Sequence, residues 1–145
     1  MRLILRFMLV ALSCAAFAQS SSELEPNMNC IERLEMPTYP RIAELARISG
    51  TVRATVTPNS AGAAGDPIIT ETVVDPTGKL KNFAPAAVQE ALRKSRFRTD
   101  CSGKSITVVF IFENDPHLDS RHPQVVSYEY PNRFRISVPV PLVQN

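Results

Sequence analysis

The side chains best suited to metal chemistry gather in one stretch of the sequence. Four carboxylate or imidazole groups fall within eight residues there: Asp115, His117, Asp119 and His122. Such groups bind divalent metal ions when their spacing places them around one point. Pro116 and Pro123 interrupt any regular spacing, and the two histidines are not one helical turn apart. We therefore predict a polar exposed loop without a metal, and keep a metal site as the least favoured alternative.

The sequence contains no motif for nucleophilic catalysis or phosphate binding. It contains no Gly-x-Ser-x-Gly, and no glycine-rich loop opens a helix. Cys30 and Cys101 do not form a Cys-x-x-Cys redox motif. In an exported chain two such cysteines are expected to form a disulfide, which leaves no thiolate for catalysis. We predict a protein that is not an enzyme and needs no cofactor.

The N-terminal residues predict export. Two arginines precede an apolar run at 7–18, and Ala16 and Ala18 give the small-x-small pattern that signal peptidase accepts. We predict cleavage between Ala18 and Gln19, and hence an exported, periplasmic protein. The run of 12 residues is shorter than the ~20 that span a bilayer, so a retained anchor is the weaker alternative. A lipoprotein anchored at Cys14 is a third.

Removal of the predicted signal peptide also removes the net charge. The full sequence has 16 Lys and Arg against 14 Asp and Glu. The first 18 residues hold two of the arginines and no acid, so 14 residues of each sign remain. A neutral chain lacks the positive charge that drives nucleic-acid binding. We therefore predict no nucleic-acid partner.

Hydrophobic periodicity predicts two helices and five strands. Pro40 suits the first turn of a helix that ends at Gly50, and a second helix covers 85–96 with apolar residues at three- and four-residue spacing. Alternating or β-rich runs predict strands at 51–58, 66–75, 105–112, 124–130 and 133–140. This order favours an α+β fold, in which a small antiparallel sheet carries two helices packed on one face and a C-terminal β extension follows.

Several short motifs follow one another in a fixed order between residues 36 and 113. They are Tyr39-Pro40-x-x-Ala43, Gly50-Thr51-Val52, Gly78, Ala86-Ala87-x-x-x-Ala91-x-x-x-x-Arg96-Phe97 and Val108-x-Phe110-x-Phe112. In order and spacing these motifs resemble the TonB C-terminal domain family. Family members usually have Trp, Pro and Asp where this sequence has Ser95, Thr99 and Ala84.

The resemblance implies a small antiparallel sheet backed by two helices, and a function in protein contacts. In the energy transducer of this family, the domain captures a short peptide of an outer-membrane transporter by pairing it with a sheet edge. The chain would then comprise a signal peptide at 1–18, a flexible lead at 19–35, a TonB C-terminal-like domain at 36–113, and a loop and β-rich extension at 114–145. The lead is too short to cross the periplasm, which favours a free-standing exported module.

A protein partner is the expected ligand. The predicted partner-binding residues are Tyr39, Pro40, Arg96, Arg133 and Arg135. The alternative is that the first two only start a helix, and that Arg96 belongs to a solvated helix end whose charge complements the helix dipole. The strand at 133–140 is the predicted exposed edge. The alternative function is an envelope structural or assembly protein, homodimeric through the same edge.

Overall fold

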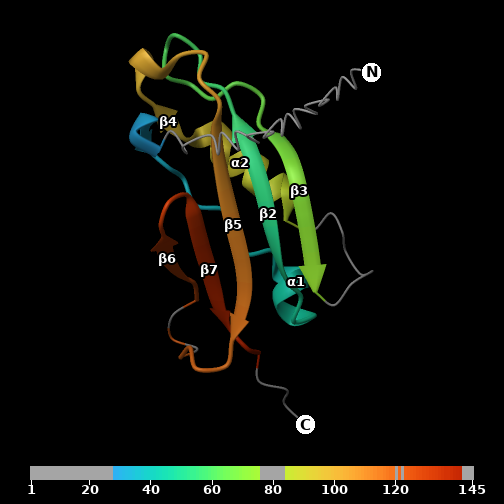
Figure 1. Cartoon of the computed structure of the whole chain (residues 1–145). Coiled ribbons are helices and arrows are strands. Elements are labelled where there is room, and N and C mark those ends of the chain that lie inside the picture. Colours follow the sequence, from blue (N-terminus) through green and yellow to red (C-terminus); the bar gives the residue numbers. More distant parts are fainter. Residues whose placement is uncertain (1–27, 76–83, 120, 122, 142–145) are drawn as a thin grey trace, which may run out of the picture.

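A computed structural model describes residues 28–75, 84–119, 121 and 123–141 (Figure 1). The predicted signal peptide and its Ala18–Gln19 cleavage site lie outside these residues. The elements in chain order are η1 (Met28–Cys30), β1 (Ile31–Arg33), α1 (Arg41–Leu45), β2 (Ser49–Val56), β3 (Ile68–Asp75), α2 (Pro85–Lys94), β4 (Arg96–Phe97), η2 (Thr99–Cys101), β5 (Ile106–Asp115), β6 (Val125–Glu129) and β7 (Arg133–Pro139). The predicted α+β class is confirmed.

The main sheet has five strands in the order β3-β2-β5-β7-β6. In this sheet β7 runs parallel to β5, and the other three neighbouring pairs are antiparallel. The predicted small antiparallel sheet is present as β3-β2-β5, and the predicted C-terminal extension joins it through the parallel pair β5–β7. The chain reverses after β5, and the hairpin that follows places its second strand, not its first, beside β5.

One face of the sheet forms the core because alternate residues of each strand point to it. Val52, Phe110 and Phe134 lie in register across β2, β5 and β7, and the first two are buried. Both helices cover this face, since Ala43 of α1 and Val88 of α2 belong to the same buried cluster. The prediction of two helices on one face is confirmed, and Figure 1 shows α2 behind the sheet. The opposite face carries polar side chains of β2 and β7 together with Val109 and Ile111 of β5.

Helix α1 is shorter and more exposed than its apolar spacing predicts. Only Ala43 is buried, while Ile42 and Leu45 are exposed. The helix ends before Gly50, because Arg47 takes a left-handed conformation (φ 52°) and Ile48 N donates to Ala43 O at 2.8 Å. This is the Schellman pattern of helix termination.

A second sheet pairs β1 with β4, and no periodic pattern in the sequence predicts it. Ile31 lies opposite Phe97, and Arg98 N donates to Cys30 O at 2.9 Å. Cys30 and Cys101 form the predicted disulfide, with their Cα atoms 5.7 Å apart. The described part of the predicted lead is thus held against the domain by strand pairing and by a covalent bond.

Candidate functional site

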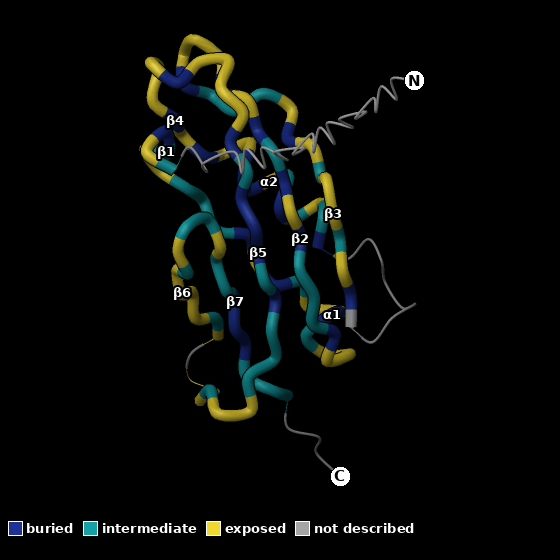
Figure 2. Tube along the Cα trace, viewed as in Figure 1, coloured by how far each residue is buried: buried dark blue, intermediate teal, exposed yellow. Residues whose placement is uncertain are grey.

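The β6–β7 hairpin forms one border of the main sheet, and its outer strand β6 exposes apolar side chains. Val125, Val126 and Tyr128 of β6 are 40%, 40% and 53% exposed, whereas the neighbouring strand β7 buries Ile136 and Val138 completely or nearly so. Figure 2 shows this contrast between the exposed border strand and the buried strands beside it. No strand in the described parts of the chain pairs with the outer edge of β6.

This arrangement corrects the prediction of the exposed edge. The strand at 133–140 was expected to be the border, but β7 lies between β5 and β6 and pairs with both. An edge strand offers unpaired backbone N–H and C=O groups, and β7 uses both of its sides within the sheet. The border strands of the sheet are β6 and β3.

Two anchors fix the hairpin to the rest of the fold. At its turn, Val109 N donates to Asn132 O and Asn132 Nδ2 donates to Thr107 O, each at 2.9 Å. At the start of β6, Gln124 Oε1 accepts from Tyr39 N at 3.0 Å and its Nε2 donates to Pro37 O at 3.3 Å. The border strand is therefore held at both ends.

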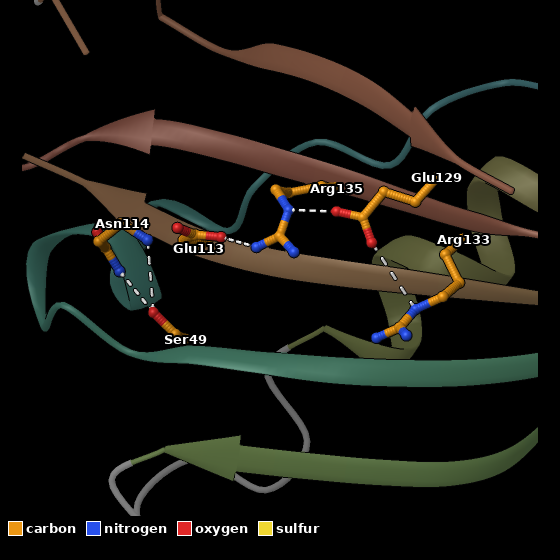
Figure 3. Close-up of polar contacts among 6 residues, drawn as sticks. All are labelled: Ser49, Glu113, Asn114, Glu129, Arg133 and Arg135. Atoms are coloured by element: carbon orange, nitrogen blue, oxygen red, sulfur yellow. Dashed lines mark hydrogen bonds and ion pairs between the residues drawn. The ribbon is translucent and has the colours of Figure 1, made fainter. Parts of the chain in front are cut away.

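Charged side chains link three strands on the face that no helix covers (Figure 3). Arg135 of β7 donates to Glu129 of β6 through Nε at 2.7 Å, and to Glu113 of β5 through Nη1. Arg133 Nε lies 3.9 Å from the second oxygen of Glu129. The hydrogen bonds to Glu129 and then Glu113 raise the pKa of Arg135 above its usual value. Two of the three arginines predicted to bind a partner, Arg133 and Arg135, therefore form ion pairs within this sheet.

The other predicted partner-binding residues lie elsewhere. Tyr39 is buried on the helix-covered face, where its ring meets Phe112 edge to face with centroids 5.5 Å apart. Pro40 precedes α1. Arg96 is exposed on β4, in the two-stranded sheet. The structure therefore does not bring the five residues together into one surface.

Tyr39 instead belongs to a buried polar cluster at the end of β5. Its hydroxyl donates to Ile48 O at 2.5 Å and accepts from Asn114 Nδ2 at 2.9 Å, and Ser49 Oγ lies 3.5 Å from the same Nδ2. Burial is the main cause that raises the pKa of Tyr39 to about 12. A neutral phenol that is fully used in hydrogen bonds serves the fold, which favours the structural alternative for this residue.

The acidic and histidine-containing loop shows local contacts. Asp115 Oδ1 accepts from His117 N at 2.8 Å, and Asp119 pairs with Arg121 at 2.5 Å. Within residues 28–75, 84–119, 121 and 123–141, no three His, Cys, Asp or Glu side chains are grouped to hold a metal ion. His122 lies outside the described residues.

No protein-family model and no curated protein matches this chain. Among the described residues no helix is long and apolar enough to cross a membrane. The disulfide is compatible with an oxidising compartment, where exported proteins keep such bonds.

Tyr128 and Val126 of the border strand were not among the predicted partner-binding residues. Their alternation with Ser127 was visible as a β-patterned run, and the run has no lysine to protect an edge. What could not be seen from local pattern was that this run, rather than the next one, lies at the border.

Proposed function

We propose that this chain is a periplasmic, TonB-like interaction module that is not an enzyme. It binds a strand-like segment of an envelope partner, such as an outer-membrane transporter, by β-augmentation along β6. The observation that carries the proposal is the unpaired outer edge of β6 together with its exposed Val126 and Tyr128. Backbone hydrogen bonds would supply affinity there, and the alternate side chains would supply specificity.

The arrangement of residues 40–113 supports the family resemblance on which the proposal rests. The chain runs through α1, β2, β3, α2 and β5, and the three strands are neighbours in the order β3-β2-β5. Both helices pack on one face of these strands. This is the small sheet backed by two helices that the resemblance implies.

The geometry of the two border strands favours β6 over β3 as the binding edge. β6 keeps continuous register with β7 from Val125 to Glu129. β3 changes register opposite Arg53 and Ala54, where Glu71 and Ile69 are the successive partners. A bulge of this kind twists an edge and hinders the addition of another strand.

The test is a titration of the isotopically labelled chain from Gln19 onward with N-terminal peptides of outer-membrane transporters, followed by NMR. Amide shifts are expected along β6 and not along β3. Val126→Lys should abolish the shifts, because a lysine on an edge strand opposes further pairing. Val73→Lys is the matched control, since Val73 is an exposed valine on the other border strand. It should leave the titration unchanged.

The absence of shifts along any strand edge at millimolar peptide would exclude the transporter as partner. Shifts confined to β3 would show that the binding edge has been assigned to the wrong strand.

A second candidate function, a homodimeric envelope assembly protein, is favoured by the sequence of β6 itself. If two copies paired antiparallel about Ser127, each Tyr128 would face a Val126, and each Val125 would face a Glu129. Aromatic and β-branched residues are favourable cross-strand pairs, and no two like charges would be opposed. Light scattering over a range of concentrations tests this candidate, and a mass that stays monomeric would reject it.

A further inference from the structure

Three aromatic rings form a row that ends at the border of the sheet. Phe110, Phe134 and Tyr128 are register partners across β5, β7 and β6. The ring centroids are 6.0 Å apart in the first pair and 5.1 Å in the second, with interplanar angles of 31° and 42°. Rings at these separations attract one another beyond the area they bury.

Exposure increases along this row. Phe110 is fully buried, Phe134 is partly buried, and Tyr128 is 53% exposed. Each of the two inner rings thus has an apolar neighbour on the next strand outward, whereas the last ring has none on its outer side among the described strands. A strand added at the outer edge of β6 could place a further aromatic ring next to Tyr128.

The hydroxyl of Tyr128 does not account for the exposure of its ring. It donates to Pro131 O at 2.7 Å, within the turn of the same hairpin. The polar end of the side chain is therefore satisfied internally and points back to the turn. What Tyr128 offers outward is the ring.

The charges next to this edge do not select a charged partner. On the opposite face of the sheet, Arg135 pairs with Glu113 and Glu129, and Glu129 also faces Arg133. These four residues balance one another. Recognition at this edge should then depend weakly on salt, since no charge is left for long-range attraction.

On the basis of the proposed function, we infer that the segment captured by β6 carries an aromatic residue opposite Tyr128. Its next residue on the same face, two positions away, lies beside the exposed Val126 and is apolar. The single residue between them lies opposite Ser127 on the other face of the strand, and is polar and uncharged. The partner is thus an extended segment with an apolar stripe centred on an aromatic ring, which continues the row Phe110, Phe134 and Tyr128 by one member.

The probe is a short capped peptide of alternating Thr and Val with one variable central position on the Val side, occupied by Phe or Ala. Binding to the labelled chain from Gln19 onward is followed by NMR. The Phe peptide should bind about threefold to tenfold more tightly than the Ala peptide, which is the usual range for an aromatic cross-strand pair. Its ring protons should show contacts to the ring of Tyr128.

Two variants separate the ring from the hydroxyl. Tyr128→Phe should retain the preference for the Phe peptide, and Tyr128→Ala should abolish it while weaker binding along β6 persists. Thermal unfolding of both variants checks that the hairpin is intact.

The possible outcomes of these experiments test the inference separately from the proposed β-augmentation along β6. Equal affinity for the Phe and Ala peptides, with shifts along β6, would overturn the inference and leave β-augmentation standing. Ring contacts away from Tyr128 would also overturn it. If no peptide shifts any strand edge, both the inference and binding at β6 fail.

Discussion

The Nε of Arg135 on β7 donates to Oε1 of Glu129 on β6 across 2.7 Å. The same guanidinium donates to Glu113 on β5. One side chain therefore ties the border strand and a central strand to the strand between them. This bracing keeps the proposed binding edge attached to the helix-backed part of the sheet.

Replacement of Arg135 should weaken this bracing. Arg135→Gln is expected to lower the free energy of unfolding by ~0.5–1 kcal/mol, a modest figure because the side chain is 36% exposed and solvent screens the pairs. Urea unfolding measures the loss. The matched control is Arg53→Gln on the same face, which has the single exposed partner Glu71 at 3.3 Å and should cost less. Equal losses for the two variants, or a loss that persists in molar salt, would contradict this reading.

A second prediction concerns two glycines that both have a positive φ. Gly62 has φ 71° and Gly103 has φ 77°, so alanine is strained at either position. A Cβ at Gly62 would also overlap the carbonyl oxygen of Phe97, whereas a Cβ at Gly103 meets nothing within 4 Å. Gly103→Ala should cost ~1–2 kcal/mol from backbone strain alone. Gly62→Ala should cost clearly more, because the turn must move away from Phe97.

Thermal and urea unfolding of the two glycine variants give the comparison. Similar losses in the free energy of unfolding would mean that the turn at Gly62 can shift to accommodate a methyl group at little cost. In that case the contact between this turn and β4 is softer than its hydrogen bond from Phe97 N to Gly62 O, at 2.9 Å, suggests.

The third prediction follows from the raised pKa of Tyr39. Because this pKa is about 12 in the folded chain and near 10 in the unfolded chain, the folded state holds the proton more tightly between these values. Stability is fully present below pH ~10 and is lost as the pH rises from ~10 through 12. Ultraviolet titration should show one of the three tyrosines ionising late.

Tyr39→Phe is the variant that tests this assignment. It should remove the late ionisation and flatten the loss of stability above pH ~10. Near neutral pH it should cost ~1–3 kcal/mol, because Ile48 O loses its hydroxyl donor and Asn114 Nδ2 loses the nearer of its two partners. A late ionisation that survives in this variant would show that it does not belong to Tyr39.

The fourth prediction concerns the disulfide between Cys30 and Cys101. The bond joins positions 71 residues apart, and closure of such a loop stabilises a fold by roughly 4 kcal/mol on the chain-entropy model. Cys30→Ser with Cys101→Ser should lower the free energy of unfolding by about that amount, in urea unfolding under oxidising conditions. In the chain from Gln19 onward, alkylation should add two blocking groups only after reduction. Labelling of both thiols without a reductant would contradict the bond.

The parts of the fold that could be predicted are the elements whose buried face follows from the spacing of apolar residues within the element itself. The alternation of Val52, Ala54 and Val56 and the apolar spacing of Val88 and Leu92 led directly to β2 and α2. Each pattern describes one element facing one core. It needs no knowledge of which other element lies beside it.

The parts that could not be predicted depend on pairing between distant residues. Arg133 and Arg135 look like surface residues of an edge strand, and only their partners on β5 and β6 show that β7 is interior. Ile42 and Leu45 have helical spacing but lie on a helix of five residues that buries only Ala43. The two-residue strand β4 is too short to leave a periodic signal.

The order β3-β2-β5-β7-β6 also has a consequence for how the chain reaches its native state during synthesis. The N-terminal elements can assemble as soon as β5 has emerged, but β5 then has a bare side until β6 and β7 follow. A half-made sheet with an uncovered apolar strand is the kind of species that aggregates. The sheet is therefore complete only when β6 and β7 have paired with it, and chaperones should bind this chain most in the interval before that.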